Sequence, residues 1–119
     1  MTRYNWSEVP EEKMNPLLSR RVIHTPEMTI ARLFLAKGAF VPTHTHINAQ
    51  LVQVTTGALL FKFPNPDGEV EVVLRDGDVL PIAPSVPHSA EALEDTYAVD
   101  TFTPARQDWI DGDDSYLRK

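Results

Sequence analysis

Residues 38–50 read GAFVPTHTHINAQ, and this stretch decides what the rest of the chain can be. His44 and His46 stand two positions apart in a segment that has the composition of a strand. Successive side chains of a strand point to opposite faces, so these two imidazoles are predicted to share one face. Both could then bind one metal ion at about 2.0–2.1 Å, and Gln50 could add an amide oxygen from the same or the next strand.

The histidine pair also has a plainer interpretation, because two such imidazoles are more often solvated or hydrogen-bonded than bound to a metal. A third histidine, His88, follows the turn-rich segment 77–87 and has no covalent reason to lie near the pair. A barrel fold could bring it there. The fourth, His24, precedes a Thr-Pro pair and is expected at the surface or at the end of a strand.

The chain from Arg20 to Phe102 is a series of short β-like runs separated by turn signals, which is typical of an all-β sandwich or barrel. Glycine supplies positive φ and proline fixes φ near about −65°, so both stop strands and reverse the chain. No gap between the runs has room for a long helix. The expected strands are Arg20–His24, Met28–Ala36, His44–Ile47, Gln50–Thr55, Ala58–Phe63, Val70–Leu74, Val79–Ile82, His88–Ala92 and Tyr97–Phe102.

The alternation of side chains along these strands predicts which residues share a face. A closed barrel buries one such face of every strand. Tyr97 has the opposite parity to Asp100 and is expected outside the barrel. The sets predicted to face together are Gln50, Val52 and Val54; His88, Ala90 and Ala92; and Ala98, Asp100 and Phe102.

Length and composition limit the number of domains and the kinds of site that the chain can form. The chain has 119 residues, 11 Lys+Arg, 17 Asp+Glu, a net charge of −6 and no cysteine. One domain over residues 1–119 is expected, with a barrel core over about 20–103, since domains usually have roughly 100–150 residues. The absence of cysteine excludes a disulfide, a thiolate metal site and a thiol nucleophile.

The charge of the chain also argues against two classes of partner. Nucleic acid and anionic membranes both demand a positive surface, which a net charge of −6 does not favour. No apolar run approaches the roughly 20 residues that cross a bilayer, and the first residues lack the apolar core of a signal peptide. A cytoplasmic protein is expected. The first 19 residues should form an arm on the barrel or on a second subunit, and the acidic tail around Trp109 should fray at its end.

Two motifs resemble those of the cupin superfamily. The pattern Gly-x5-His-x-His-x3-Gln-x6-Gly, from residue 38 to residue 57, resembles the first cupin motif, with Gln50 where many cupins have Glu. The segment from residue 77 to His88 is similar to the second motif. It departs from that motif at Ala83 and Ser85, where Pro and Gly are usual, and at Ala92, where Asn is usual.

The resemblance covers about residues 33–102 and implies a fold and a metal site. The implied fold is a small double-stranded β-helix, the cupin jelly-roll barrel, with an N-terminal arm and a short C-terminal tail. It also implies a homodimer. The implied cofactor is one divalent transition metal per chain (Zn, Ni, Mn, Fe or Co), held by His44, His46, Gln50 and His88.

The run from Asp100 to Trp109, DTFTPARQDW, is similar to a stretch of the KdgF type of single-domain cupins, which takes part in pectin degradation. That resemblance implies a metal-dependent enzyme that converts 4,5-unsaturated monouronates, from pectin or alginate, to linear 5-keto-4-deoxyuronate. It also implies a small anionic sugar-acid substrate in a pocket lined by Asp100, Phe102 and Arg106.

The residue chemistry agrees with such a reaction. A neutral amide ligand leaves the ion its full charge, so Gln50 favours a Lewis acid over a redox centre. Asp100 is the candidate acid–base group, Arg106 offers a planar fork to a carboxylate, and Phe102 would pack on the sugar. The plainer alternatives are that Asp100 pairs with Arg106, that Arg106 neutralises the acidic tail, and that Phe102 is core.

Two other functions fit the same residues. One is a cupin dioxygenase that acts on a small diketone or phenol, and the other is a non-catalytic barrel that binds a sugar or a metal. Oxygen uptake by an Fe(II)-loaded sample would support the first. Ligand-induced thermal stabilisation without turnover would support the second.

Overall fold

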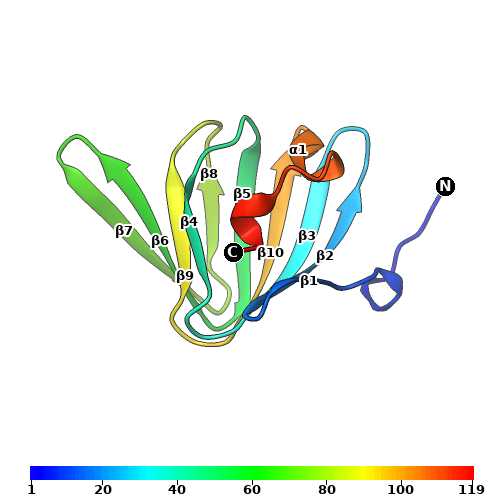
Figure 1. The fold of residues 1–119 in the computed structure, drawn as a ribbon, viewed down its shortest axis with the longest axis horizontal. Helices are drawn as coiled ribbons and strands as arrows, with labels where there is room; N and C mark the ends of the chain where they lie inside the picture. The colour runs from blue at the N-terminus through cyan, green and yellow to red at the C-terminus, as the bar shows by residue number, and fades with distance from the viewer.

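The computed structural model describes all residues, 1–119, and places ten strands in two antiparallel sheets (Figure 1). Three short helical turns accompany them: η1 (Trp6–Glu8), α1 (Gln107–Ile110) and η2 (Ser115–Leu117). The strands are β1 (Glu12–Asn15), β2 (Leu18–His24), β3 (Thr29–Leu35), β4 (Phe40–His44), β5 (Ala49–Thr56), β6 (Ala58–Asn65), β7 (Gly68–Arg75), β8 (Val79–Ile82), β9 (His88–Ala92) and β10 (Thr96–Thr103).

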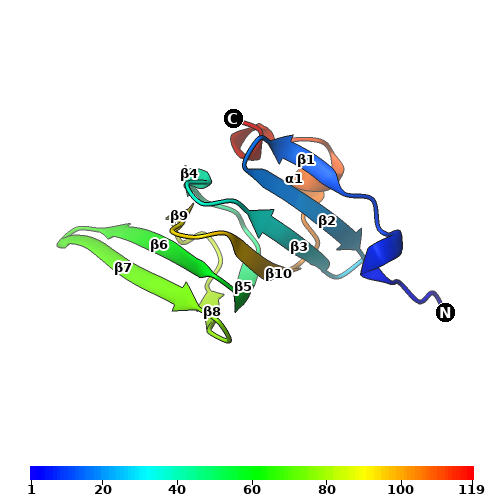
Figure 2. The same cartoon turned by 90° about the horizontal axis from the view of Figure 1, so that it is seen from below.

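The two sheets face one another with the core between them. The six-stranded sheet has the order β1-β2-β3-β10-β5-β8, and the four-stranded sheet has the order β4-β9-β6-β7. Figure 2 shows the same arrangement from below, with β6 and β7 reaching away from the six-stranded sheet. The all-β barrel expected from the sequence is confirmed.

Turn glycines close the strands, and Gly57 is the one that steric contact demands most. It joins β5 to β6 with φ +117°, which favours glycine. A Cβ added at Gly57 would lie 2.5 Å from Thr96 Oγ1 and 2.6 Å from the carbonyl oxygen of Asp95. The last glycine of the first motif is therefore required by the packing of β10 as well as by its own backbone.

The predicted alternation holds along the interior strands. Val52, Val54, Ala98 and Phe102 are all buried in the core between the sheets. Tyr97, of opposite parity, lies on the outer face and is 49% exposed. The core also takes in residues outside the range 20–103, namely Met14, Leu18, Trp109 and Leu117.

The segment around the first two histidines differs from the prediction of a strand over His44–Ile47. Strand β4 ends at His44, and residues 45–48 form a bend that carries His46. The pairing of β4 with β9 is irregular between Val41 and His44. Pro42 lies between them and cannot donate a ladder hydrogen bond, which an edge strand such as β4 tolerates.

Both ends of the chain are structured. Residues 12–15 of the expected arm form β1, which pairs with β2 at the sheet edge, whereas the first residues project from the body (Figure 1). Residues 107–117 of the acidic tail contain α1 and η2 and bury Trp109 and Leu117, and only Arg118 and Lys119 follow the last helical turn. The longest helix, α1, has four residues, so none has the length and apolar character needed to cross a bilayer.

Candidate metal centre and its cavity

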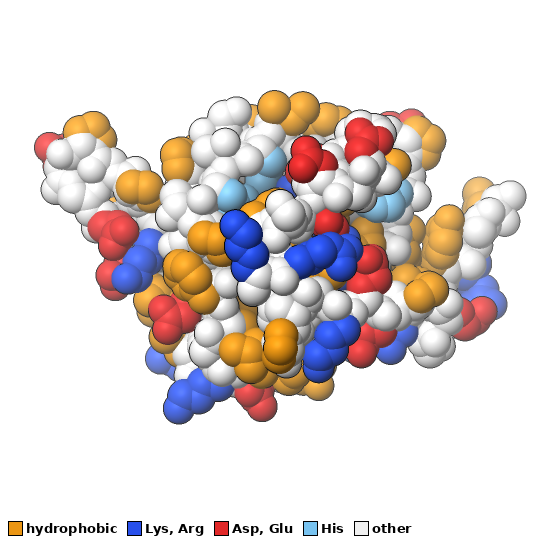
Figure 3. Space-filling view, in the orientation of Figure 1, with side chains coloured by type: hydrophobic (Ala, Val, Ile, Leu, Met, Phe, Trp, Pro, Cys, Tyr) orange, Lys and Arg blue, Asp and Glu red, His pale blue; other side chains and the backbone are white.

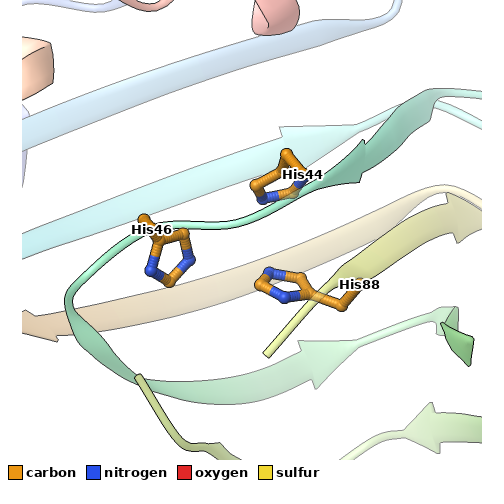
Figure 4. A group of neighbouring side chains, drawn as sticks. All are labelled: His44, His46 and His88. Atoms are coloured by element: carbon orange, nitrogen blue, oxygen red, sulfur yellow. The ribbon is translucent and has the colours of Figure 1, made fainter. Parts of the chain in front are cut away.

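Three histidines meet where β4 ends and β9 begins (Figure 4). His44, the last residue of β4, is paired across the sheet with His88, the first residue of β9. His46 comes from the following bend, and its ring centroid lies 5.2 Å from that of His88. One ring nitrogen of each residue lies within 4.8 Å of the others. The fourth histidine, His24, lies apart at the end of β2, with Nδ1 2.7 Å from Thr29 Oγ1.

Backbone carbonyls fix the orientation of all three rings. Each Nδ1 donates to a carbonyl two residues away: His44 to Pro42 at 2.8 Å, His46 to Asn48 at 3.0 Å, and His88 to Val86 at 2.8 Å. A carbonyl oxygen accepts but cannot donate, so each neutral ring carries its proton on Nδ1. Each Nε2 therefore keeps its lone pair free, which is the arrangement found in metal-binding histidines.

The cluster also favours neutral imidazoles. Burial is the main cause that lowers the pKa of His44 to about 4, and the charges of His88, His46 and Arg106 act in the same direction. The hydrogen bond to Pro42 opposes this shift. Burial likewise lowers the pKa of His46 and of His88. Because a metal binds the deprotonated ring, these shifts prepare the cluster for a cation at neutral pH.

Two contacts show that a cation fits. His88 Nε2 is fully buried and has no hydrogen-bond partner in the protein. His46 Nε2 lies 3.0 Å from Gln50 Oε1, where two acceptors would face each other without a positive charge between them. The contact of the Gln50 amide with the Asp100 carboxyl lowers the pKa of Asp100. His44, His46, His88 and Gln50 could therefore together hold one divalent cation.

Asp100 lies beside this cluster on β10, where its side chain lines the same cavity as His44, Gln50 and His88. Burial raises the pKa of Asp100 to about 7, against the hydrogen bond from Gln50 and the charge of Arg106, which lower it. It forms no ion pair, so the alternative in which Asp100 pairs with Arg106 is not what the structure contains. A carboxyl group that titrates near neutrality can both hold and release a proton.

Arg106 lines the cavity from the opposite side, but its fork is already occupied. Its Nε and Nη2 donate to the two carboxylate oxygens of Asp108 at 3.0 and 2.8 Å, and Nη2 also donates to Tyr116 Oη at 2.8 Å. Nη1 donates to no protein acceptor. The plainer alternative, in which Arg106 neutralises an acid of the tail, therefore holds for Nε and Nη2. Nη1 remains available for a ligand.

Aromatic rings hold these charged groups in place. The Arg106 guanidinium lies 4.6 Å from the ring centroid of Phe102 and 4.3 Å from that of Trp109. Phe102 is a core residue, as its plainer alternative states, and it also lines the cavity and meets the His46 ring edge-on at 5.5 Å. The two interpretations of Phe102 are therefore compatible.

Sequence analysis missed three residues of this site. Asp108 holds Arg106, and Tyr116 and Leu117 line the cavity from the C-terminal segment. The Tyr116 ring centroid lies 4.7 Å from that of His44. Tyr116 follows a run of acidic residues that is typical of a solvated tail, and no local pattern relates it to a histidine more than 70 residues earlier.

The cavity enclosed by these residues is small, about 50 Å³. In Figure 3, histidine side chains (pale blue) are visible near the middle of this face, beside acidic side chains. A larger hollow of about 540 Å³ lies elsewhere, on the outer face of the six-stranded sheet, and is lined by residues such as Trp6, Arg32 and Tyr97. It contains no histidine, so the chemical groups are concentrated in the smaller cavity.

Comparison with known proteins agrees with the fold. The chain is similar to an RmlC-like cupin from Shewanella frigidimarina (26% identity, TM-score 0.80, covering 89% of this chain and 93% of that one). It is also similar to KdgF from Halomonas sp. (25% identity, TM-score 0.80, covering 91% of this chain and 99% of that one). Oxalate decarboxylase of Bacillus subtilis shares the fold alone, at 16% identity and a TM-score of 0.75 over 85% of this chain and 29% of that one.

No curated protein sequence matches the chain. The sequence profile of the family described as Cupin matches residues 18–109, which include every strand from β2 to β10 and all four residues of the donor set. The chain therefore belongs to the cupin family.

Proposed function

We propose that the protein opens the ring of 4,5-unsaturated monouronates and yields the linear 5-keto-4-deoxyuronate, with one divalent metal per chain. The observation that carries the proposal is the cavity in which an imidazole and amide donor set faces Asp100 and one unpaired nitrogen of Arg106. The likeness to KdgF from Halomonas sp. supports the same assignment.

The proposed reaction is an isomerisation, and its atoms balance without a co-reactant. The hemiacetal hydroxyl at C1 loses its proton, and the bond between C1 and the ring oxygen breaks. The ring oxygen becomes the enol oxygen on C5. The enol then becomes a ketone as C4 gains a proton, so no oxidant or reductant is needed.

Residues of this chain supply the proton transfer and the orientation. Asp100, with a pKa near 7, is suited to deliver the proton to C4 and to regain one from the hemiacetal hydroxyl. Arg106 would donate from Nη1 to the substrate carboxylate, and its orientation is fixed by Asp108. Phe102 would cover the sugar ring and exclude water.

The donor set of His44, His46, Gln50 and His88 would hold the metal. A divalent cation there supplies Lewis-acid polarisation of substrate oxygens. Three neutral imidazoles and an amide leave its positive charge uncompensated, which favours an anionic ligand such as a uronate.

The test is to incubate purified protein with an unsaturated monouronate in separate samples that contain Zn²⁺, Ni²⁺, Mn²⁺, Fe²⁺ or Co²⁺. Loss of the ultraviolet absorbance of the double bond, with the linear ketone identified by NMR, is expected for at least one metal. Asp100→Asn should lower kcat by about 100-fold or more, since it removes a general acid–base group. Asp67→Asn, in the exposed turn after β6, is the matched control and should leave kcat unchanged.

Retention of the double bond with all five metals would refute the proposal. Oxygen consumption by the Fe²⁺ sample with a diketone or phenol would point to a dioxygenase instead. Thermal stabilisation by the uronate without product would point to a binding protein.

A further inference from the structure

The C-terminal segment Asp114–Arg118, here called the C-terminal cap, lies over the cavity. It contains η2, which lies beside β4, and it brings Tyr116 and Leu117 into the cavity lining. Figure 2 shows this end of the chain next to β1, at the edge of the six-stranded sheet. The cap therefore connects the rim of the barrel to the space in front of His44.

The cavity in this structure is too small for any ligand larger than a few waters. Its volume of about 50 Å³ compares with about 10–15 Å³ needed for one water, so it holds about three to five waters. Sites for organic ligands usually have about 300–1,000 Å³. A six-carbon sugar acid does not fit unless part of the lining moves, and the ligand size in this step rests on the proposed function.

The cap is held by polar side-chain contacts in addition to the burial of Leu117 in the core. The buried Asp114 carboxylate accepts hydrogen bonds from Arg20 on β2 and from Arg118. Arg118 also pairs with Glu12 on β1, at 3.6 Å. Asn15 Nδ2 donates to the carbonyl oxygen of Leu117 at 3.0 Å. By contrast, most of the other lining residues belong to strands with a neighbour on each side, whereas β4 is an edge strand and Arg106 and Trp109 lie outside the sheets.

One polar group at these contacts is incompletely satisfied. Arg20 is 4% exposed, and its Nη1 has no hydrogen-bond partner, whereas its Nε lies 3.4 Å from Glu12 Oε1. Unpaired buried donors carry a desolvation cost that opening to water removes. The cap is joined to α1 through residues 111–113, where Gly112 has φ +79° and open space at its Cβ position.

We propose that the C-terminal cap is the gate of the cavity, and that Tyr116 and Leu117 must be displaced before an organic ligand reaches His88. The contacts of Asp114 and Arg118 with β1 and β2 are the latch that keeps the gate closed. Tyr116 holds the gate closed from within the cavity. Its hydroxyl accepts hydrogen bonds from Arg106 Nη2 at 2.8 Å and from Trp109 Nε1 at 3.2 Å. Both of these bonds must break when the gate opens.

A reversible crosslink across the latch tests the proposal, because the chain has no cysteine of its own. Glu12→Cys with Arg118→Cys places two thiols where exposed side chains now meet, and a short bis-methanethiosulfonate reagent joins them. The matched control is Arg75→Cys with Glu94→Cys, an exposed pair at 3.9 Å that is remote from the cavity. Reductant releases both crosslinks.

The readout does not depend on any reaction of the protein. Diethylpyrocarbonate, an organic reagent comparable in size to a monouronate, modifies free imidazoles, and peptide mass spectrometry measures the modification of each histidine in the metal-free protein. The latch crosslink should slow modification of His88 by about tenfold or more, and reductant should restore it. His24, at the end of β2, should react at the same rate in every sample. The control crosslink should leave His88 unchanged.

A second variant keeps the test decisive. Asp114→Asn weakens the latch and should speed modification of His88. The measurement is made without denaturant, at a temperature where circular dichroism shows that the variant is folded. Equal His88 rates in the crosslinked and reduced protein would overturn the gate. If the latch crosslink slows His88 modification but the protein does not turn over uronates, the gate is retained and the proposed function is refuted. If uronate turnover is the same with and without the latch crosslink, the proposed function is retained and the gate is refuted.

Discussion

The two walls of the cavity are organised in different ways. On the histidine wall, each ring is oriented by a backbone carbonyl two residues away. On the opposite wall, Arg106 is held by Asp108, Tyr116 and two aromatic rings, and Tyr116 comes from the far end of the chain.

This difference separates what binds a cation from what orients a substrate. On the histidine wall, local backbone orients each ring, and the pairing of β4 with β9 brings His88 beside His44. The arginine wall depends on side chains that meet through tertiary packing, so changes there should alter the substrate without altering the metal. The predictions below change residues of one wall or of its support and measure metal affinity, turnover or stability.

The largest effect is expected on the histidine wall. His88→Ala removes one of three imidazoles and should lower the affinity for Zn²⁺ or Ni²⁺ by on the order of 1,000-fold, measured by isothermal titration calorimetry. His24→Ala is the control and should bind the metal as the wild type does, since His24 lies outside the cluster. Wild-type affinity in His88→Ala would show that the cluster does not hold the ion.

The next largest effect concerns the support of the arginine wall. Burial would raise the pKa of Asp114, but the hydrogen bonds and charges of Arg118 and Arg20 outweigh it and hold that pKa below its ordinary value. Asp114→Asn leaves the buried Arg20 with only its longer contact to the half-exposed Glu12, 3.4 Å away, and should cost about 3 kcal/mol of unfolding free energy in urea at neutral pH. The exposed Asp113→Asn is the control.

The same pair predicts a pH dependence. Because the folded pKa of Asp114 is depressed, its contribution is complete above the unfolded pKa, about 4, and is lost as pH falls through the folded value. The difference in unfolding free energy between the wild type and Asp114→Asn should therefore shrink as pH falls below about 4. A difference that stays constant between neutral pH and about pH 2 would contradict the ion pair.

A smaller effect is expected at Asp108, where a change should affect substrate turnover but not metal affinity. Asp108→Asn releases one carboxylate contact of Arg106 and should lower kcat/KM for the unsaturated monouronate by about 10- to 100-fold, because a displaced guanidinium misplaces the substrate. The metal affinity should not change. Asp111→Asn, on the exposed side of α1, is the matched control. A parallel loss of metal affinity in Asp108→Asn would show that the walls are coupled.

The smallest effect is expected at the amide between the walls. Gln50→Glu adds a negative ligand and should raise the metal affinity by about tenfold at most, since the new carboxylate also repels Asp100. Gln53→Glu, on the outer face of the same strand, is the control and should have no effect. An unchanged affinity in Gln50→Glu would remove Gln50 from the donor set.

Much of the fold could be predicted because strand alternation and turn residues act locally. The strands Val79–Ile82 and His88–Ala92 have the predicted bounds, and most others differ by one or two residues. The prediction failed near Pro42, because a proline bulge ends β4 at His44. Strand β1 was missed because its residues have no clear alternation and gain their partners only from β2.

The amino-acid sequence by itself determined the cupin motifs, the inward face of the interior strands and the four residues expected as metal donors. The spacing of His44, His46 and Gln50 is local, whereas the pairing of β4 with β9 brings His88 beside them. Only the tertiary structure decided that Arg106 is held by Asp108 and that Tyr116 closes the cavity over His44. Those contacts join distant parts of the chain through burial and ion pairing, for which the sequence of neighbouring residues carries no periodic signal.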